Sequence, residues 1–99
     1  MNPKEYALTC FAEEAMEVAH AAMKVLRFTE NDSHTIGGPT NLENLQKEMN
    51  ELFAMMEVLD GFDIHLCADE RLIKQKRDRY SDYLDYSAKL GVVQNVSFG

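Results

Sequence analysis

The stretch Phe11–His20, FAEEAMEVAH, places three glutamates among alanines, a valine and a methionine. Alanine and valine favour burial, whereas a carboxylate favours water. On a helical wheel Glu13 points away from the apolar residues, but Glu14 lies at the edge of the apolar stripe. Glu17 follows one turn later on the same side. The stretch therefore predicts a helix with two acidic side chains at the border of its buried face.

Around this stretch the chain has the pattern of an all-α protein, a bundle of about three main helices. Asn2 and Thr40 each begin a capping box, and glycines follow the second and third apolar periodic segments. A polar loop separates the first two helices. The predicted helices run from Pro3 to about Phe28, from the Thr40 capping box to Gly61, and from about Ala68 to Lys89.

The length and charge of the chain limit what it can be. Ninety-nine residues predict one domain, residues 1–91, followed by a tail, residues 92–99. A net charge of −7 argues against binding to a nucleic acid polymer or an anionic membrane. No apolar run is long enough to span a bilayer, and Cys10 and Cys67 do not make a disulfide framework. We expect a cytoplasmic protein.

The apolar residues predict self-association. The first helix has a broad alanine face, and the second is richer in methionine, leucine and phenylalanine than one partner could cover. A homodimer or a dimer of dimers would complete the bundle. The alternative is a lone three-helix bundle.

The second helix repeats the acidic pattern of the first, with Glu48 and Glu51 beside its apolar stripe. Four carboxylates at one bundle margin would repel one another unless they were protonated or neutralised. Oxygen-only ligands suit Mg²⁺, or Mn²⁺ in its place. Alternatively, each pair only borders a solvated face. The third helix adds two cations, Lys76 and Arg79, which we expect to project inward and to contact the glutamates or a phosphate chain. Alternatively, their aliphatic parts lie along the apolar surface and their charged groups reach solvent.

The order of these motifs resembles that of the MazG-like nucleotide pyrophosphohydrolases, in the all-α NTP pyrophosphatase superfamily. The family pattern of E-x-x-E, a spacer, E-x-x-D and a basic K-x-x-R corresponds here to Glu14-x-x-Glu17, Glu48-x-x-Glu51 and Lys76-x-x-Arg79. Glu51 replaces the aspartate that the family prefers, and the spacer of thirty residues is long. Small proteins of this type are common in phages as well as in bacteria, so the resemblance also allows a phage origin and, with it, a location in the host cytoplasm.

The resemblance implies a metal-dependent enzyme that cleaves a nucleoside triphosphate to the monophosphate and pyrophosphate, with dGTP or GTP as a candidate substrate. Glu14, Glu17, Glu48 and Glu51 would be the metal-binding and catalytic residues, and the one least engaged with Mg²⁺ would orient the attacking water. Lys76, Arg79 and Tyr83 would bind the substrate.

Some residues leave alternatives open. His34, in the long loop, could reach a base but is also a plain loop residue. Phe28, Tyr80 and Tyr83 could stack on a base or pack in the core. A competing function is a non-catalytic, acidic helical oligomer that binds a protein partner through its methionine-rich face.

Overall fold

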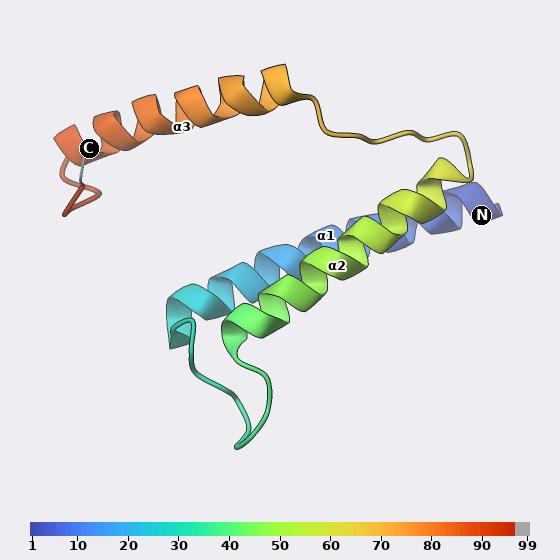
Figure 1. The fold of residues 1–99 in the computed structure, drawn as a ribbon, viewed down its shortest axis with the longest axis horizontal. Helices are drawn as coiled ribbons and strands as arrows, with labels where there is room; N and C mark the ends of the chain where they lie inside the picture. Colours follow the sequence, from blue (N-terminus) through green and yellow to red (C-terminus); the bar gives the residue numbers. More distant parts are fainter. Residues whose placement is uncertain (97–99) are drawn as a thin grey trace. The chain divides into compact units, whose positions relative to one another are not determined.

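The structure is a computed structural model that describes residues 1–96, and within these residues it contains three α-helices and no strand. The helices are α1 (Pro3–Phe28), α2 (Asn41–Asp60) and α3 (Glu70–Lys89) (Figure 1). The predicted all-α class is therefore confirmed. The chain divides into two compact units, Met1–Leu66 and a second unit from Cys67 onward, and each is described by itself.

Both predicted capping boxes are present. The Asn2 side chain accepts a hydrogen bond from the Glu5 backbone N–H at 2.8 Å, and the Thr40 hydroxyl oxygen accepts one from the Glu43 N–H at 3.1 Å. In each box the glutamate side chain accepts in return from the capping residue's N–H. These bonds satisfy donors that a helix start otherwise leaves unpaired, and they explain why α1 and α2 begin where the sequence predicts.

The start of α3 differs from the prediction by two residues, whereas the end of α2 agrees with it. α3 begins at Glu70 rather than near Ala68, because the Asp69 carboxylate accepts hydrogen bonds from the N–H groups of two residues in the first turn, Arg71 and Leu72. Gly61 ends α2 as predicted, and it does so with a helical φ of −64°. Asp63 takes the left-handed conformation instead, with a φ of 62°.

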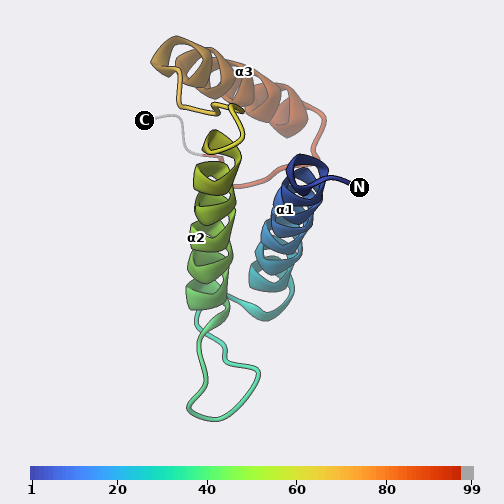
Figure 2. The same ribbon diagram turned by 90° about the vertical axis from the view of Figure 1, so that its right-hand side faces the viewer.

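α1 and α2 run antiparallel and side by side, as the two ribbon views show (Figures 1 and 2). Each helix contributes one line of buried or half-buried residues, spaced alternately by four and three positions. This is the spacing of coiled-coil packing. We call these two lines the seam: Ala7, Phe11, Glu14, Val18, Ala21 and Val25 on α1, and Asn41, Leu45, Glu48, Leu52, Met55 and Leu59 on α2.

The seam uses only part of the predicted apolar face of α1. The alanines of the broad alanine face are exposed on the single chain, as are the leucines at its two ends, so their packing against another copy stays a prediction. Packing uses only the edge of that face that carries Phe11, Val18 and Val25. The exposed line follows the same four-and-three spacing: Leu8, Ala12, Ala15, Ala19, Ala22 and Leu26.

The loop between α1 and α2 is held against the start of α2. The backbone N–H groups of Asn41 and Leu42 donate to the carbonyl oxygens of Asp32, at 2.9 Å, and Glu30, at 3.1 Å. Asn41, only 5% exposed, also donates its side-chain N–H to the Thr29 carbonyl at 2.9 Å. The loop is thus tied to α2 by three hydrogen bonds and has a defined path.

α3 buries none of its residues within the second unit. Lys76, Arg79 and Tyr83 are exposed within this unit, and the inward projection of the two cations, which requires a neighbouring helix, stays a prediction. The chain after α3 turns back on the helix end, because the Val92 N–H donates to the Ser87 carbonyl at 3.0 Å. The predicted tail, residues 92–99, extends past the described residues at positions 97–99.

The α2 cap gives a stability prediction. Thr40→Ala removes the acceptor for the Glu43 N–H and should lower the free energy of unfolding by about 1 kcal/mol. Thr9→Ala is the control, because the exposed Thr9 hydroxyl caps no helix start: it donates to the Glu5 carbonyl within α1 and lies 3.8 Å from the Met1 sulfur. Thermal unfolding followed by circular dichroism measures both. Equal melting temperatures for Thr40→Ala and wild type would show that this cap contributes no stability.

Candidate metal centre

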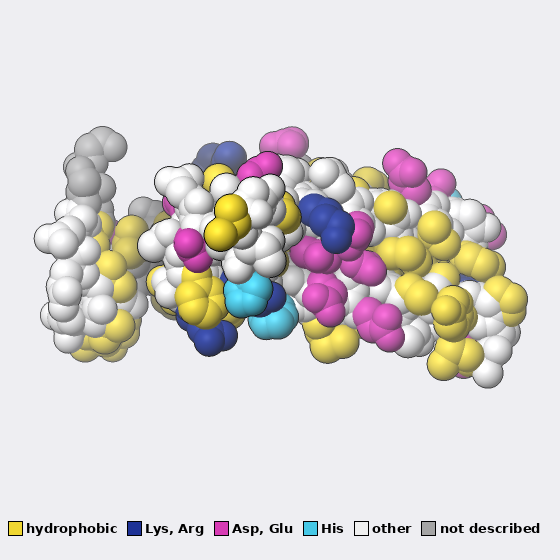
Figure 3. Space-filling model, turned by 90° about the horizontal axis from the view of Figure 1, so that it is seen from below, with side chains coloured by type: hydrophobic (Ala, Val, Ile, Leu, Met, Phe, Trp, Pro, Cys, Tyr) yellow, Lys and Arg dark blue, Asp and Glu magenta, His cyan; other side chains and the backbone are white. Residues whose placement is uncertain are grey.

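Three of the four predicted acidic ligands come together between α1 and α2. Glu14, Glu48 and Glu51 each place a carboxylate oxygen within 4.8 Å of the others, and all three are half-buried. The sequence pattern predicted Glu14 and Glu48 at the margin of the packed face. In the structure both lie on the seam itself. We call these three residues the acidic cluster. Figure 3 shows acidic side chains gathered on this part of the molecule.

One oxygen of the acidic cluster lacks a partner. Glu14 Oε2 is buried and makes no hydrogen bond with any described residue. Burying a carboxylate oxygen without a compensating donor or cation is unfavourable. The site is therefore chemically incomplete when all three carboxylates are ionised.

The surroundings of the acidic cluster raise two pKa values. Burial raises the pKa of Glu14 above its ordinary value, and the charge of Glu51 and a hydrogen bond that the two carboxyls share when one is protonated raise it further. Burial also raises the pKa of Glu48, again with a hydrogen bond to Glu51 and its charge as the next causes. The nearby Lys47 ammonium opposes this rise only in part. Both shifts arise first from burial of the carboxyl groups and then from the negative charge of neighbouring carboxylates.

Glu17, the fourth predicted ligand, does not belong to the acidic cluster. It is exposed, one turn after Glu14 on α1. Its charge nevertheless contributes to the raised pKa of both Glu14 and Glu48, so it lies within electrostatic reach of the cluster. The structure thus separates the four acids into three that converge and one at their side.

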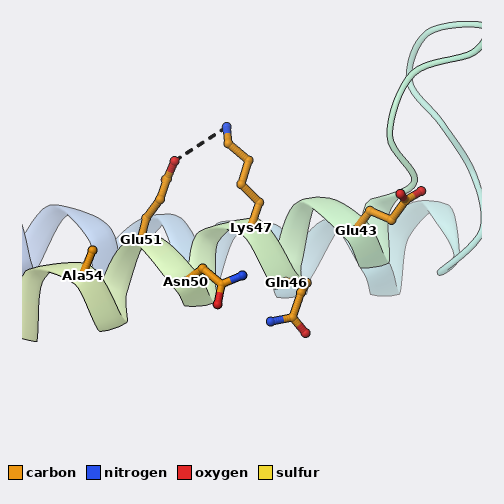
Figure 4. A pocket seen from close by; sticks show the side chains of 6 residues that line it. All are labelled: Glu43, Gln46, Lys47, Asn50, Glu51 and Ala54. Atoms are coloured by element: carbon orange, nitrogen blue, oxygen red, sulfur yellow. Dashed lines mark ion pairs between the residues drawn. The ribbon is translucent and has the colours of Figure 1, made fainter.

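Lys47 is a neighbour of the cluster that the sequence analysis missed. Its ammonium lies 3.8 Å from Glu51 Oε1, and both side chains rise from the same side of α2 (Figure 4). The four-residue spacing of an acid and a base on one helix was the available signal. The surface hollow in Figure 4 is lined by residues of α2 alone, so it encloses no ligand by itself.

The predicted substrate contacts lie in the second unit, on α3. Lys76 and Arg79 make no ion pair with any residue from 1 to 96, whereas Lys74 is engaged with Asp78 at 2.9 Å. Lys76 and Arg79 are thus cations without a carboxylate partner on their own helix. Their proposed contact with phosphate, like that of Tyr83 with substrate, stays a prediction.

The donor set of the acidic cluster fits a hard divalent cation. It consists of carboxylate oxygens alone, which Mg²⁺ and Mn²⁺ prefer, and it lacks the nitrogen or sulfur ligands typical of Zn²⁺. A cation would supply the missing partner of Glu14 Oε2 and would offset the repulsion among the three carboxylates. The residues present therefore fit the predicted metal.

The chain was also compared with known proteins. No protein-family model, no curated protein and no solved structure matches the chain. Among residues 1–96, no helix is sufficiently long and apolar to cross a bilayer. A functional proposal must therefore stand on the residues and their geometry.

The raised pKa values predict an unusual pH dependence in metal-free buffer. A carboxyl group whose folded pKa is raised stabilises the fold at low pH and loses that contribution as pH rises through the folded value. Lowering the pH from 7 towards the ordinary value of 4.5 should therefore stabilise the wild type through Glu14 and Glu48. Glu43 acts oppositely, since its bonds to Thr40 lower its pKa, but that loss occurs mainly below this range.

The Glu14→Gln/Glu48→Gln double variant isolates this effect from histidine titration. It should melt at a higher temperature than wild type at pH 7 and should gain less on acidification. Glu57→Gln, which removes an exposed charge from α2, is the control and should follow wild type. Identical pH profiles for wild type and the double variant would contradict the crowding of charge at the cluster.

Proposed function

We propose that the chain is a metal-dependent nucleoside triphosphate pyrophosphohydrolase, which converts a (deoxy)nucleoside triphosphate to the monophosphate and pyrophosphate. The observation that carries the proposal is the acidic cluster, built from two helices with one buried oxygen left without a partner. The order of the acidic and basic motifs along the chain supports the same function. The choice of dGTP or GTP rests on the sequence resemblance alone.

Glu14, Glu48 and Glu51 would hold Mg²⁺. When bound, the ion would offset charge on the phosphate chain and lower the pKa of a water molecule. The seam fixes the backbone on either side of Glu14 and Glu48, so their carboxylates are held close together before substrate arrives. Positioning of this kind accounts for much of catalysis in phosphoryl transfer.

Glu17 would orient the attacking water and accept its proton. It is the one acid of the four outside the cluster, and it is solvent-exposed. A carboxylate that is not engaged with metal keeps its oxygens free for a proton. Lys76 and Arg79 would contact phosphate oxygens, and Tyr83 would contact the rest of the substrate.

We also propose that two or more copies associate. The helix pair buries only three apolar side chains, Ala7, Ala21 and Leu59, which is little for an independent fold. The exposed line of α1 has coiled-coil spacing and matches a second helix of the same kind. Light scattering at micromolar concentration should give a dimer or tetramer. A monomer would contradict this part of the proposal.

The exposed apolar surface also favours a second candidate function, a non-catalytic interaction module. Large apolar side chains such as Tyr6, Phe53 and Leu66 are exposed, and patches of this kind mark protein interfaces. An interaction module needs no metal and no triphosphate cleavage, so the next two measurements distinguish it from an enzyme.

Metal binding should raise thermal stability. Mg²⁺ at one hundred times its dissociation constant should stabilise the fold by about 2.7 kcal/mol, if only the folded state binds it. Glu48→Gln should remove most of this gain although it relieves repulsion in metal-free buffer. Glu57→Gln, an exposed acid elsewhere on α2, should keep the gain. If neither Mg²⁺ nor Mn²⁺ changes the melting temperature of the wild type, the proposed metal centre is wrong.

Catalysis should separate from metal binding at Glu17. With Mg²⁺ and a panel of nucleoside triphosphates, the wild type should release pyrophosphate. Glu17→Gln should lower kcat by about 10²–10⁴-fold, the usual contribution of a general base, while keeping the Mg²⁺-induced rise in melting temperature. Pyrophosphate release and nucleotide chromatography measure the reaction. If no triphosphate is cleaved although Mg²⁺ stabilises the protein, the enzymatic proposal fails and the metal has another role.

A further inference from the structure

A second site lies in the same unit, where the loop meets the ends of α1 and α2. It is a cavity of about 170 Å³. Its walls come from three consecutive parts of the chain: the last turns of α1, the loop and the first turn of α2. We call it the loop cavity, and its lining residues are Lys24, Phe28, Asp32, His34, Asn41 and Asn44.

The loop cavity has a preformed wall. Asn41 is 5% exposed, and its amide is held by the 2.9 Å bond to the Thr29 carbonyl. The carbonyl of Asp32 accepts from the Asn41 N–H, and Ser33 donates its hydroxyl to the Gly38 carbonyl. These bonds fix the path of the loop on either side of His34. A ligand would therefore find much of the cavity already in place.

The lining combines one aromatic ring with groups that both donate and accept hydrogen bonds. Phe28 offers one ring face for stacking, since the Arg27 guanidinium lies over the ring at 4.7 Å from its centroid, and the half-buried Asn44 amide carries a donor and an acceptor. The Asn41 amide is nearly buried and donates to the Thr29 carbonyl, so it shapes the wall of the cavity. Stacking on an aromatic ring and amide contact with a base edge are the usual means by which proteins hold a nucleobase. Lys24 and Asp32 add one cation and one anion, so the cavity does not select for net charge.

The size of the loop cavity limits its ligand. Pockets for drug-sized molecules span roughly 300–1,000 Å³, so this one suits a single small ring system and not a whole nucleotide. We propose that the loop cavity binds the nucleobase of a nucleotide. Base binding in the loop cavity does not depend on the proposed function. The further step, that the phosphates of the same ligand reach the acidic cluster, rests on the proposed function.

The distance along the helices agrees with one extended ligand. Asn44 precedes Glu48 by four residues and Lys24 follows Glu17 by seven, which at the helical rise correspond to roughly 6 and 10 Å. A ribose with its first phosphates can bridge such a gap. Both sites belong to the unit Met1–Leu66, so one helix pair would hold the base at one end and the phosphates at its middle.

The test uses nucleosides, which have a base but no phosphate, in metal-free buffer. Guanosine, adenosine, cytidine and uridine are titrated into the labelled full chain, and NMR follows the side-chain amides of Asn41 and Asn44 and the His34 ring. Ribose 5-phosphate is the probe without a base. At least one nucleoside should shift these signals in a saturable way, and ribose 5-phosphate should not.

Two variants with matched controls locate the site. Phe28→Leu and Asn44→Ala should each weaken nucleoside binding by at least about fivefold, given the usual strength of base stacking. Tyr6→Leu removes an exposed aromatic ring at the other end of α1, and Gln46→Ala removes an exposed amide of α2 outside the cavity; both should bind as wild type does. Circular dichroism confirms that each variant folds.

The outcomes for base binding and for catalysis are separable. Nucleoside binding that depends on Phe28 and Asn44 supports the base site even if no triphosphate is cleaved. Shifts caused by ribose 5-phosphate but by no nucleoside would overturn it. Triphosphate cleavage with the same KM in wild type, Phe28→Leu and Asn44→Ala would also overturn the base site, while leaving the proposed function intact.

Discussion

Two carboxylates on the packing line of a helix pair are the constraint on which the rest of this unit depends. Glu14 and Glu48 occupy seam positions that a coiled coil normally gives to apolar residues, and Glu51 adds a third acid beside them. Ionised, they repel one another and leave a buried oxygen without a partner. Neutralisation by a proton or a cation relieves both costs, so the stability of the pair is linked to whatever the acids bind.

This cost falls on a small core. Among the described residues, Ala7, Ala21 and Leu59 are the buried apolar side chains, and two of them are alanines. Such a core leaves little surplus stability with which to hold three acids together. A bound cation and a second copy of the chain would act in the same direction, one by neutralising the seam and the other by covering the exposed line of α1. Binding and assembly would then be coupled through the folding of one helix pair.

Sequence patterns predicted the local features of the fold better than the packing. The caps at Asn2 and Thr40 depend on atoms three residues apart, so the chain order contains the necessary information. Which edge of α1 is packed depends on α2. The seam residues and the exposed line of α1 have the same four-and-three spacing, so the sequence alone does not choose between them. For that reason the sequence did not show which line of α1 packs against α2, and Glu14 was predicted beside the packed line rather than on it. The separation of Glu17 from the cluster and the closure of the loop cavity also need the path of α2 in space.

The most direct test of a cation held by the seam is paramagnetic broadening by Mn²⁺ at substoichiometric concentration, observed by NMR on the full chain. Broadening should begin at the residues around Glu14, Glu48 and Glu51 and should be lost in the Glu14→Gln/Glu48→Gln variant. Asp60, Asp63 and His65 form a competing polar group at the end of α2, where the histidine ring contacts both carboxylates. Broadening that begins there, or equally at all exposed acids, would contradict a metal centre in the seam.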